Sequence, residues 1–249
     1  MLPPRHSIRF PNLPPHQLGQ HEAYFFLDEN HQEVRLRFHD YGELFKRPGL
    51  YEQLFYDRLK CVSPKVVAGL IEEVISAQNA NLSELRVLDV GAGNGMMGGT
   101  LMERGVSRIV GIDIAPEARE ALRRDRPGVY DEYYVADLAS PTEELVQTLR
   151  SWSFDCMCCV AALGFGDIPP AAFVTAFNLV ADQGWLAFNI KETFLDAQDE
   201  SGFSALIKEM IFSQYVDIYH MQRYRHRLSI DGKPLYYYAI VARKLRAYP

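Results

Sequence analysis

An acidic residue followed by alternating glycines is the part of this sequence whose residue types are best suited to hold a cofactor. Asp89 follows the apolar residues Val87 and Leu88, and it is followed in turn by Gly91 and Gly93. Glycine adopts a positive φ and lets a ligand approach the backbone without meeting a Cβ. A helix that starts directly after such a loop turns its first N–H groups toward the same ligand. The pattern predicts a strand, a tight loop and a helix around a nucleotide cofactor.

Two classes of nucleotide cofactor fit this loop. Residues 93–98 match the G-x-G-x-x-G pattern of dinucleotide folds, in which the start of the helix takes a pyrophosphate. Asp89 would lie close to that anion, whereas a cofactor with an ammonium, a sulfonium and no phosphate gains from a nearby carboxylate. Read as Asp-x-Gly-x-Gly-x-Gly, residues 89–95 resemble motif I of the class I S-adenosylmethionine-dependent methyltransferases.

The resemblance covers residues 60–249 and implies where the other cofactor contacts lie. Asp113 ends the second expected strand, where a carboxylate accepts the ribose hydroxyls in methyltransferases and dinucleotide folds alike. Asp137 ends the third and in the family contacts the adenine amino group, while its neighbour packs on the ring. The exit of the fourth strand lines the methionine half. The implied cofactor residues are Asp89, Gly91, Ala92, Gly93, Asp113, Ile114, Asp137, Leu138 and Val160.

The end of the chain separates the two cofactor classes. After a helix expected at residues 203–212, a strand through residues 224–230 meets the turn pair Asp231-Gly232, and a second strand follows within residues 233–244. A dinucleotide domain would continue instead with another strand–helix–strand unit. The predicted fold is therefore α/β, with a doubly wound, mostly parallel seven-stranded sheet that ends in an antiparallel hairpin, as in the methyltransferase fold.

The first 60 residues are expected to form an arm, a hairpin and a small lid on a methyltransferase domain at residues 61–249. Residues 1–20 are rich in proline, and residues 34–38 alternate between apolar and charged side chains. In similar small-molecule enzymes the N-terminal segment folds over the cofactor cleft, so we expect substrate contacts there and at the exits of the fourth and fifth strands. The candidate substrate residues are Tyr41, Tyr51, Tyr56, Leu163 and Lys191.

Helix starts are marked by prolines and capping residues. Ser63 is expected to cap a helix that has Pro64 in its first turn. Residues 140–143, Ser-Pro-Thr-Glu, are expected to form a capping box around the start of another helix.

Composition limits the partners of this chain. It has 249 residues and a formal net charge of −6, so a large nucleic-acid footprint, which needs clustered Lys and Arg, is not expected. No run approaches the roughly 18 apolar residues that cross a bilayer, and the N-terminus lacks an apolar signal segment. We expect a cytoplasmic protein without a nucleic-acid or membrane partner, and the sequence leaves its oligomeric state open.

A basic cluster and a cysteine cluster have plain structural interpretations. Alternation in a strand would place Arg223, Arg225 and Arg227 on one solvated face, with contact to an acidic substrate or to RNA as the alternative. Cys156, Cys158 and Cys159 fall within the expected fourth strand. No further ligand completes a zinc set at the usual spacing, so these thiols are interpreted as buried apolar residues and no metal is predicted.

Sequence patterns restrict the methyl acceptor by exclusion and assign no catalytic residue. Residues 167–170, Asp-Ile-Pro-Pro, approach the motif of DNA adenine methyltransferases, but an isoleucine is inserted and no aromatic follows, so a helix-opening turn is expected. The motifs of cytosine and arginine methylation are missing. His39, His220 and His226 are weak candidates for a general base. What remains is a small-molecule acceptor.

The leading hypothesis is thus an S-adenosylmethionine-dependent methyltransferase that acts on a small molecule. An NAD(P)-dependent oxidoreductase and a non-catalytic protein that keeps the cofactor fold are the alternatives. Residues 127–130, 154–164 and 168–169 also resemble a methyltransferase-like subgroup named after the Williams–Beuren syndrome chromosomal region. That closer resemblance implies no substrate.

Overall fold

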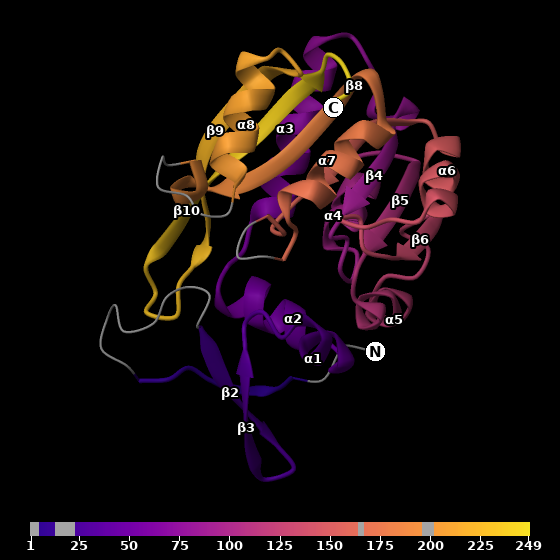
Figure 1. The fold of residues 1–249 in the computed structure, drawn as a ribbon. Coiled ribbons are helices and arrows are strands. Elements are labelled where there is room, and N and C mark those ends of the chain that lie inside the picture. The colour runs from indigo at the N-terminus through magenta and orange to yellow at the C-terminus, as the bar shows by residue number, and fades with distance from the viewer. Residues whose placement is uncertain (1–4, 13–22, 164–166, 196–201) are drawn as a thin grey trace.

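The computed structural model describes residues 5–12, 23–163, 167–195 and 202–249, and its centre is a seven-stranded sheet (Figure 1). The strands lie in the spatial order β6 (Glu132–Val135), β5 (Arg108–Asp113), β4 (Arg86–Val90), β7 (Phe154–Cys159), β8 (Val180–Lys191), β10 (Pro234–Lys244) and β9 (Val216–Leu228). The first five are parallel, and β10 is antiparallel to both β8 and β9. The expected doubly wound sheet with its C-terminal hairpin is confirmed.

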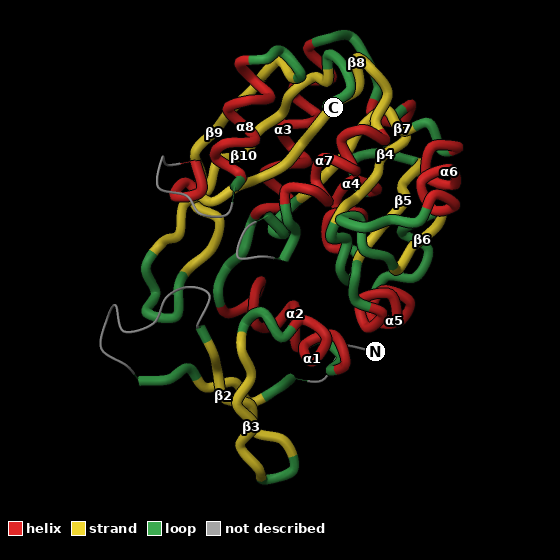
Figure 2. Tube along the Cα trace, viewed as in Figure 1, coloured by secondary structure: helices red, strands yellow, loops and turns green. Residues whose placement is uncertain are grey.

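Helices cover both faces of this sheet (Figure 2). The helices are α3 (Ser63–Ala77), α4 (Met96–Met102) and α5 (Pro116–Asp125) on one side, and α6 (Glu143–Ser151), α7 (Pro170–Leu179) and α8 (Phe203–Phe212) on the other. Along β4, Val87 packs in the core beneath α3 and α4, while Leu88 and Val90 pack beneath α6, α7 and α8. Burial on both faces explains why the parallel strands are almost continuously apolar. Among the described residues, no helix has the length and apolar character needed to span a membrane.

The N-terminal part of the chain forms a small layer of its own beside the carboxyl ends of the parallel strands (Figure 1). It contains the antiparallel strands β1 (Ser7–Arg9), β2 (Tyr24–Glu29) and β3 (Gln32–Arg37), the helices α1 (Tyr41–Lys46) and α2 (Leu50–Glu52), and a π-helical turn, η2 (Gln53–Arg58). The hairpin expected from the alternation of residues 34–38 is confirmed as β2 and β3. Two short 3₁₀ turns, η3 (Leu82–Glu84) and η4 (Glu192–Leu195), complete the described elements.

Two helix starts differ from expectation. Ser63 does not cap α3; its hydroxyl hydrogen-bonds to the Tyr224 hydroxyl at 2.6 Å and to Nδ1 of His226 at 2.6 Å, both on β9. At α6 the cap is Thr142 and not Ser140, because the Thr142 hydroxyl accepts from the N–H of Leu145. At Ser63 a tertiary hydrogen-bond network has outcompeted the local cap.

The arginines of β9 do not share one face as the alternation predicted. Leu235 on β10 pairs with Arg227, but Tyr236 pairs with Arg225, so His226 is an extra residue on β9. Such a bulge breaks the alternation of the strand. Arg227 consequently points inward and is only 5% exposed, while the other two arginines stay on the surface. The prediction of a wholly solvated basic face was wrong at Arg227.

Candidate cofactor and acceptor site

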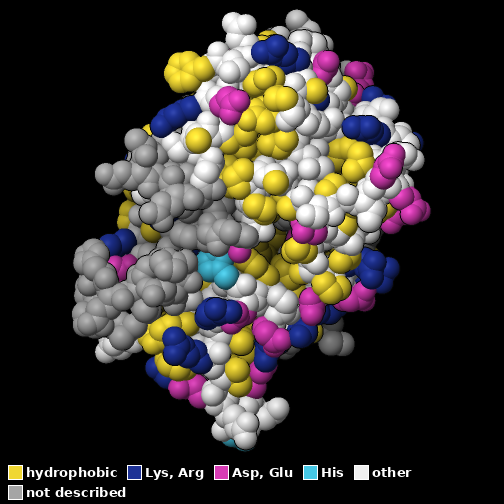
Figure 3. All heavy atoms as spheres, in the orientation of Figure 1, with side chains coloured by type: hydrophobic (Ala, Val, Ile, Leu, Met, Phe, Trp, Pro, Cys, Tyr) yellow, Lys and Arg dark blue, Asp and Glu magenta, His cyan; other side chains and the backbone are white. Residues whose placement is uncertain are grey.

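A cavity of about 390 Å³ lies at the carboxyl ends of β4, β5, β6 and β7. The chain leaves β4 toward β5 and β6 on one side, and it returns to β7 on the other side of β4. Ligands of open α/β sheets bind at such a switch point. Figure 3 shows hydrophobic side chains gathered around a hollow between the N-terminal layer and the α/β body.

The first two glycines of the loop form part of the cavity wall. Gly91 and Gly93 have φ angles of +69° and +53°. A Cβ on Gly91 would lie 2.8 Å from the Cβ of Ala162. Gly95 and Gly98 are instead required for packing, because a Cβ there would lie 2.7 Å from Leu122 and 2.6 Å from Tyr130, respectively. Of the glycines in the G-x-G-x-x-G pattern, only Gly93 therefore lines the cavity, whereas the methyltransferase pattern places both Gly91 and Gly93 there.

Asp113 connects the glycine loop to the end of β5. The Gly93 N–H donates to Oδ2 and the Ala115 N–H donates to Oδ1, both at 2.9 Å. Burial raises the pKa of Asp113, and these backbone donors oppose that effect. A carboxylate oxygen accepts two hydrogen bonds, so each oxygen can still accept one from a ribose hydroxyl.

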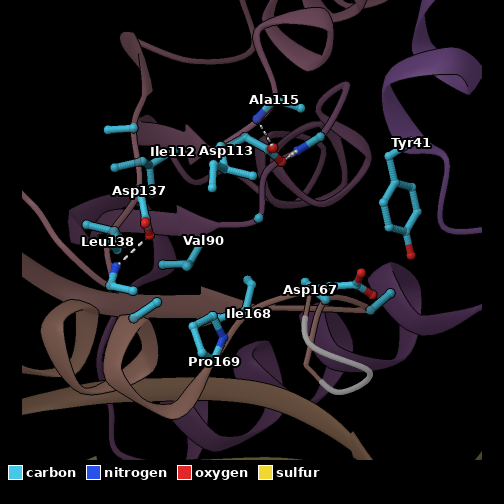
Figure 4. Close-up of a pocket in the computed structure, with 18 of the residues that line it drawn as sticks. Tyr41, Val90, Ile112, Asp113, Ala115, Asp137, Leu138, Asp167, Ile168 and Pro169 are labelled. Carbon is cyan, nitrogen blue, oxygen red and sulfur yellow. Dashed lines mark hydrogen bonds between the residues drawn. The ribbon is translucent and has the colours of Figure 1, made fainter.

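The far wall of the cavity suits an adenine ring. Ile114 lines the cavity and is 63% exposed, which is high for a large apolar side chain, and the buried Leu138 lines it as well. Asp137 also lines the cavity, and its Oδ1 accepts from the N–H of Ala139 at 2.7 Å (Figure 4). Val160, a residue expected to bind the cofactor, lines the cavity from the exit of β7. An apolar surface beside a carboxylate matches the two properties of adenine, a flat ring and an exocyclic amine.

Asp89 and Ala92 do not line the cavity, although both were expected to. Asp89 points to the other face of the sheet and accepts from the Tyr130 hydroxyl at 2.7 Å. Burial raises the pKa of Asp89 to about 7. Ala92 packs among α5 and β6 side chains, and its N–H donates to the Ile112 carbonyl. Both residues therefore support the glycine loop from the side that faces away from the cavity.

The N-terminal helices form one wall of the larger cavity, which the cofactor motifs did not predict. Tyr41, Phe45 and Tyr51 line the cavity opposite the sheet. The N-terminal layer is attached to the glycine loop through Glu52, whose Oε1 accepts from Nδ2 of Asn94 at 2.7 Å and from Nη1 of Arg126 at 2.8 Å. This layer thus forms part of the wall of the larger cavity.

We expect Glu52→Ala to lower the free energy of unfolding by about 1–3 kcal/mol, because Asn94 and Arg126 each lose their shortest hydrogen bond, which is to a carboxylate, and keep only longer ones. Binding of S-adenosylhomocysteine should weaken in parallel, since the N-terminal layer loses its attachment to the loop. Denaturant titration and calorimetry measure the two effects. Asp57→Ala, which breaks an exposed ion pair with Arg5 in the same segment, is the matched control and should change neither. Equal behaviour of the two variants would contradict this function of Glu52.

A smaller cavity of about 40 Å³ adjoins the larger one. The two share Tyr41, Tyr51, Ala161 and Asp167, and Leu163 lines only the smaller. The pair His39 and Asp167 borders it, with 3.0 Å between Nδ1 and Oδ2. A carboxylate can only accept, so Nδ1 is the donor and Nε2 is the basic nitrogen of the neutral ring. Figure 4 shows the hydroxyl end of Tyr41 directed toward Asp167.

The two remaining substrate candidates lie elsewhere. Tyr56 packs in the core of the N-terminal layer, and Lys191 is half-buried at the end of β8; neither lines either cavity. Asp167, by contrast, lines both cavities although it was interpreted only as part of a helix-opening turn. Its position after the fourth strand was the available signal.

A buried network holds the point where the two cavities meet. Oδ1 of Asn189 accepts from the N–H of Ala161 at 2.6 Å, and Nδ2 donates to the Tyr224 hydroxyl at 2.7 Å. Ala161 has a φ of +60°, which is strained for a residue with a Cβ. The network continues through Ser63 to His226, so two buried side chains of the bulged strand support the cavity wall.

The burial of His226 makes stability depend on pH. Burial, and then the charge of Arg227, lower the pKa of His226 well below its ordinary value. Below about pH 6.5 the unfolded chain therefore binds a proton that the folded chain does not. We expect the free energy of unfolding to fall with decreasing pH there, with a contribution from this residue of up to about 1.4 kcal/mol per pH unit.

Denaturant titrations of the wild type and of His226→Gln between about pH 8 and pH 5 isolate this contribution. The difference in free energy of unfolding between the two should shrink as the pH falls. His220→Gln, on the same strand, is the control and should leave the pH dependence unchanged. A difference that stays constant for His226→Gln would contradict the buried neutral state.

Comparison with known proteins decides between the two cofactor classes. The family described as "Methyltransferase domain" matches residues 61–228. The chain belongs to this family. It thereby joins the class I superfamily whose cofactor is S-adenosylmethionine, as the loop and the terminal hairpin indicated.

Individual relatives of this methyltransferase are distant. Ubiquinone biosynthesis O-methyltransferase of Nitrosomonas europaea is 29% identical to this chain over 119 residues. The matched region covers 48% of this chain and 47% of that protein, so the chain spans about half the length of this curated relative. Magnesium protoporphyrin IX methyltransferase from Synechocystis PCC 6803, solved with bound S-adenosylmethionine, superposes with a TM-score of 0.51 at 16% identity, over 73% of this chain and 79% of that one. An S-adenosylmethionine-dependent methyltransferase from Anabaena variabilis gives 0.53 at 11% identity, over 82% and 93%. These structures support the fold alone.

Proposed function

We propose that this methyltransferase transfers a methyl group from S-adenosylmethionine to a small molecule bound where the two cavities meet. The observation that carries the proposal is the shared wall of Tyr41, Tyr51, Ala161 and Asp167 between the cofactor-sized cavity and the smaller one. Residues 1–60 act as the lid over both, on a methyltransferase domain at residues 61–249. The closer resemblance to the Williams–Beuren-region subgroup belongs to this proposal as well.

The residues of the larger cavity fit the cofactor. Asp113 holds the ribose hydroxyls, Asp137 and Leu138 hold the adenine, and the backbone of Gly91 and Gly93 lies against the methionine half. When bound, S-adenosylmethionine supplies a methyl group on a sulfonium whose positive charge is lost in the reaction. The aromatic side chains of the lid exclude water and align the acceptor, and alignment alone supplies effective molarities of roughly 10⁵–10⁸ M for well-oriented pairs.

His39 is the general base in this proposal. Asp167 fixes the ring through its contact with Nδ1, so Nε2 takes up the proton that a hydroxyl or amine acceptor loses. Burial, followed by the negative charge of Asp167, raises the pKa of Tyr41. Its phenol therefore stays protonated and can donate a hydrogen bond to the acceptor.

The acceptor class is tested with S-adenosylmethionine labelled in its methyl group. The purified protein is incubated with a cell extract that has been divided into small molecules, RNA and protein. We expect the label to move only into the small-molecule fraction, and Asp113→Ala should abolish that transfer. Label in RNA or protein would contradict a small-molecule acceptor, while the methyltransferase activity itself would still stand.

A further inference from the structure

Arg227 is a buried cation beside the proposed acceptor position. The bulge at His226 turns it inward from β9, and it lines the smaller cavity together with Tyr41, Tyr51 and Tyr237. It is only 5% exposed. Burying a charge costs several kcal/mol unless an opposite charge compensates for it.

No such compensation is present in the part of the chain that the structure describes. Nη1 of Arg227 donates to the carbonyl of Leu228 at 2.9 Å, and the guanidinium lies 5.5 Å and 5.8 Å from the ring centroids of Phe38 and Phe55. No described carboxylate lies within ion-pair distance of it. The nearby acidic residue in this cavity, Asp167, contacts His39.

Two basic residues lie near Arg227, and neither supplies a negative charge. Burial first, and then the charge of Arg227, lower the pKa of Lys191. Burial also lowers the pKa of His226, so this neighbour stays neutral and supplies no negative charge. The pKa of Arg227 itself is lowered by burial, but from so high a value that the guanidinium remains protonated. Arg227 is the one Lys or Arg side chain among the described residues that line this cavity.

We propose that Arg227 binds an oxyanion of the methyl acceptor, a carboxylate or a phosphate group, in the smaller cavity. The planar guanidinium fork matches both groups, and a charge-assisted contact in a buried site is strong. The rings of Phe38, Phe55, Tyr41 and Tyr51 line the same cavity, so the part of the acceptor next to the oxyanion is apolar or aromatic. This inference rests on the proposed function, because it places the acceptor where the two cavities meet.

The geometry also orients the acceptor. Its anionic end lies at Arg227, and its reacting atom lies toward Ala161 and Asp167, which line both cavities. Arg227 then acts as a binding residue, and His39 meets the opposite end of the molecule.

Benzoate and its neutral analogue benzamide test the inference on the full chain saturated with S-adenosylhomocysteine. Ligand-observed NMR titration should show benzoate binding about 10- to 100-fold more tightly than benzamide. Phenyl phosphate is titrated in parallel, and the tighter of the two anions identifies the oxyanion. In Arg227→Met the preference for the anions should disappear. Arg225→Met removes one exposed charge from the same strand and should leave the preference unchanged.

The melting temperature of Arg227→Met distinguishes binding from structural support. Removal of an uncompensated buried charge should leave the variant at least as stable as the wild type, with unchanged affinity for S-adenosylhomocysteine. The inference is overturned if neither anion binds more tightly than benzamide, or if the preference survives in Arg227→Met. A variant that melts far below the wild type would make Arg227 structural. If the wild type itself does not bind S-adenosylhomocysteine, the proposed function is refuted instead.

Discussion

Asp113→Ala is expected to weaken S-adenosylhomocysteine binding by about 10- to 150-fold for each charge-assisted hydrogen bond lost to the ribose. The side chain also accepts from the N–H groups of Gly93 and Ala115, so its removal releases the loop that lies against the ligand. The two losses act on the same equilibrium. Calorimetric titration measures the dissociation constant directly.

The control for this variant is Asp131→Ala, at the opposite end of the pair of strands β5 and β6. Asp131→Ala removes a carboxylate that accepts from the N–H of Ile109 at 2.8 Å, far from the cavity. It should lower stability without changing affinity. An unchanged dissociation constant in Asp113→Ala would mean that the ribose does not bind at the end of β5.

His39→Ala is expected to slow methyl transfer by about 10²- to 10⁴-fold, which is the usual contribution of a positioned general base. The acceptor found by the labelling experiment is used in single-turnover measurements at saturating cofactor. Affinity for S-adenosylhomocysteine should stay within about twofold, because the ring borders the smaller cavity and not the larger.

Asp167→Asn tests what the carboxylate of Asp167 adds to the general base His39. An amide in place of the carboxylate can still contact Nδ1 but no longer stabilises a protonated ring, so the rate should fall while the fold is kept. His220→Ala, on the outer strand β9, is the control. A His39→Ala enzyme with the wild-type rate would show that the acceptor loses its proton without this base.

Part of the wall of the larger cavity was predictable from sequence. Gly91, Gly93 and Asp113 belong to short local patterns, and their backbone conformations follow from the types of residue present. Asp89 shows the limit of that method. Its spacing matches the motif, yet the alternation of β4 turns the side chain to the face opposite the cavity, where Tyr130 meets it.

The acceptor half was less predictable because non-local contacts form it. Arg227 points inward only because β9 carries an extra residue at His226, and a bulge of this kind shifts the pairing without a signal in the alternation itself. Asp167 meets His39 across 128 positions of the chain, and no spacing rule connects them. Tyr41 and Tyr51 were identified as lid residues, but their contact with the larger cavity depends on how α1 and α2 pack on the loop.

Thermal unfolding in the presence of S-adenosylhomocysteine, NAD or NADP shows which class of cofactor the folded chain binds. A ligand at 100 times its dissociation constant adds about 2.7 kcal/mol of stability, which raises the melting temperature by several degrees. S-adenosylhomocysteine should produce this rise in the wild type and not in Asp113→Ala, and NAD and NADP should produce none. A rise with NAD or NADP, and none with S-adenosylhomocysteine, would contradict S-adenosylmethionine as the cofactor.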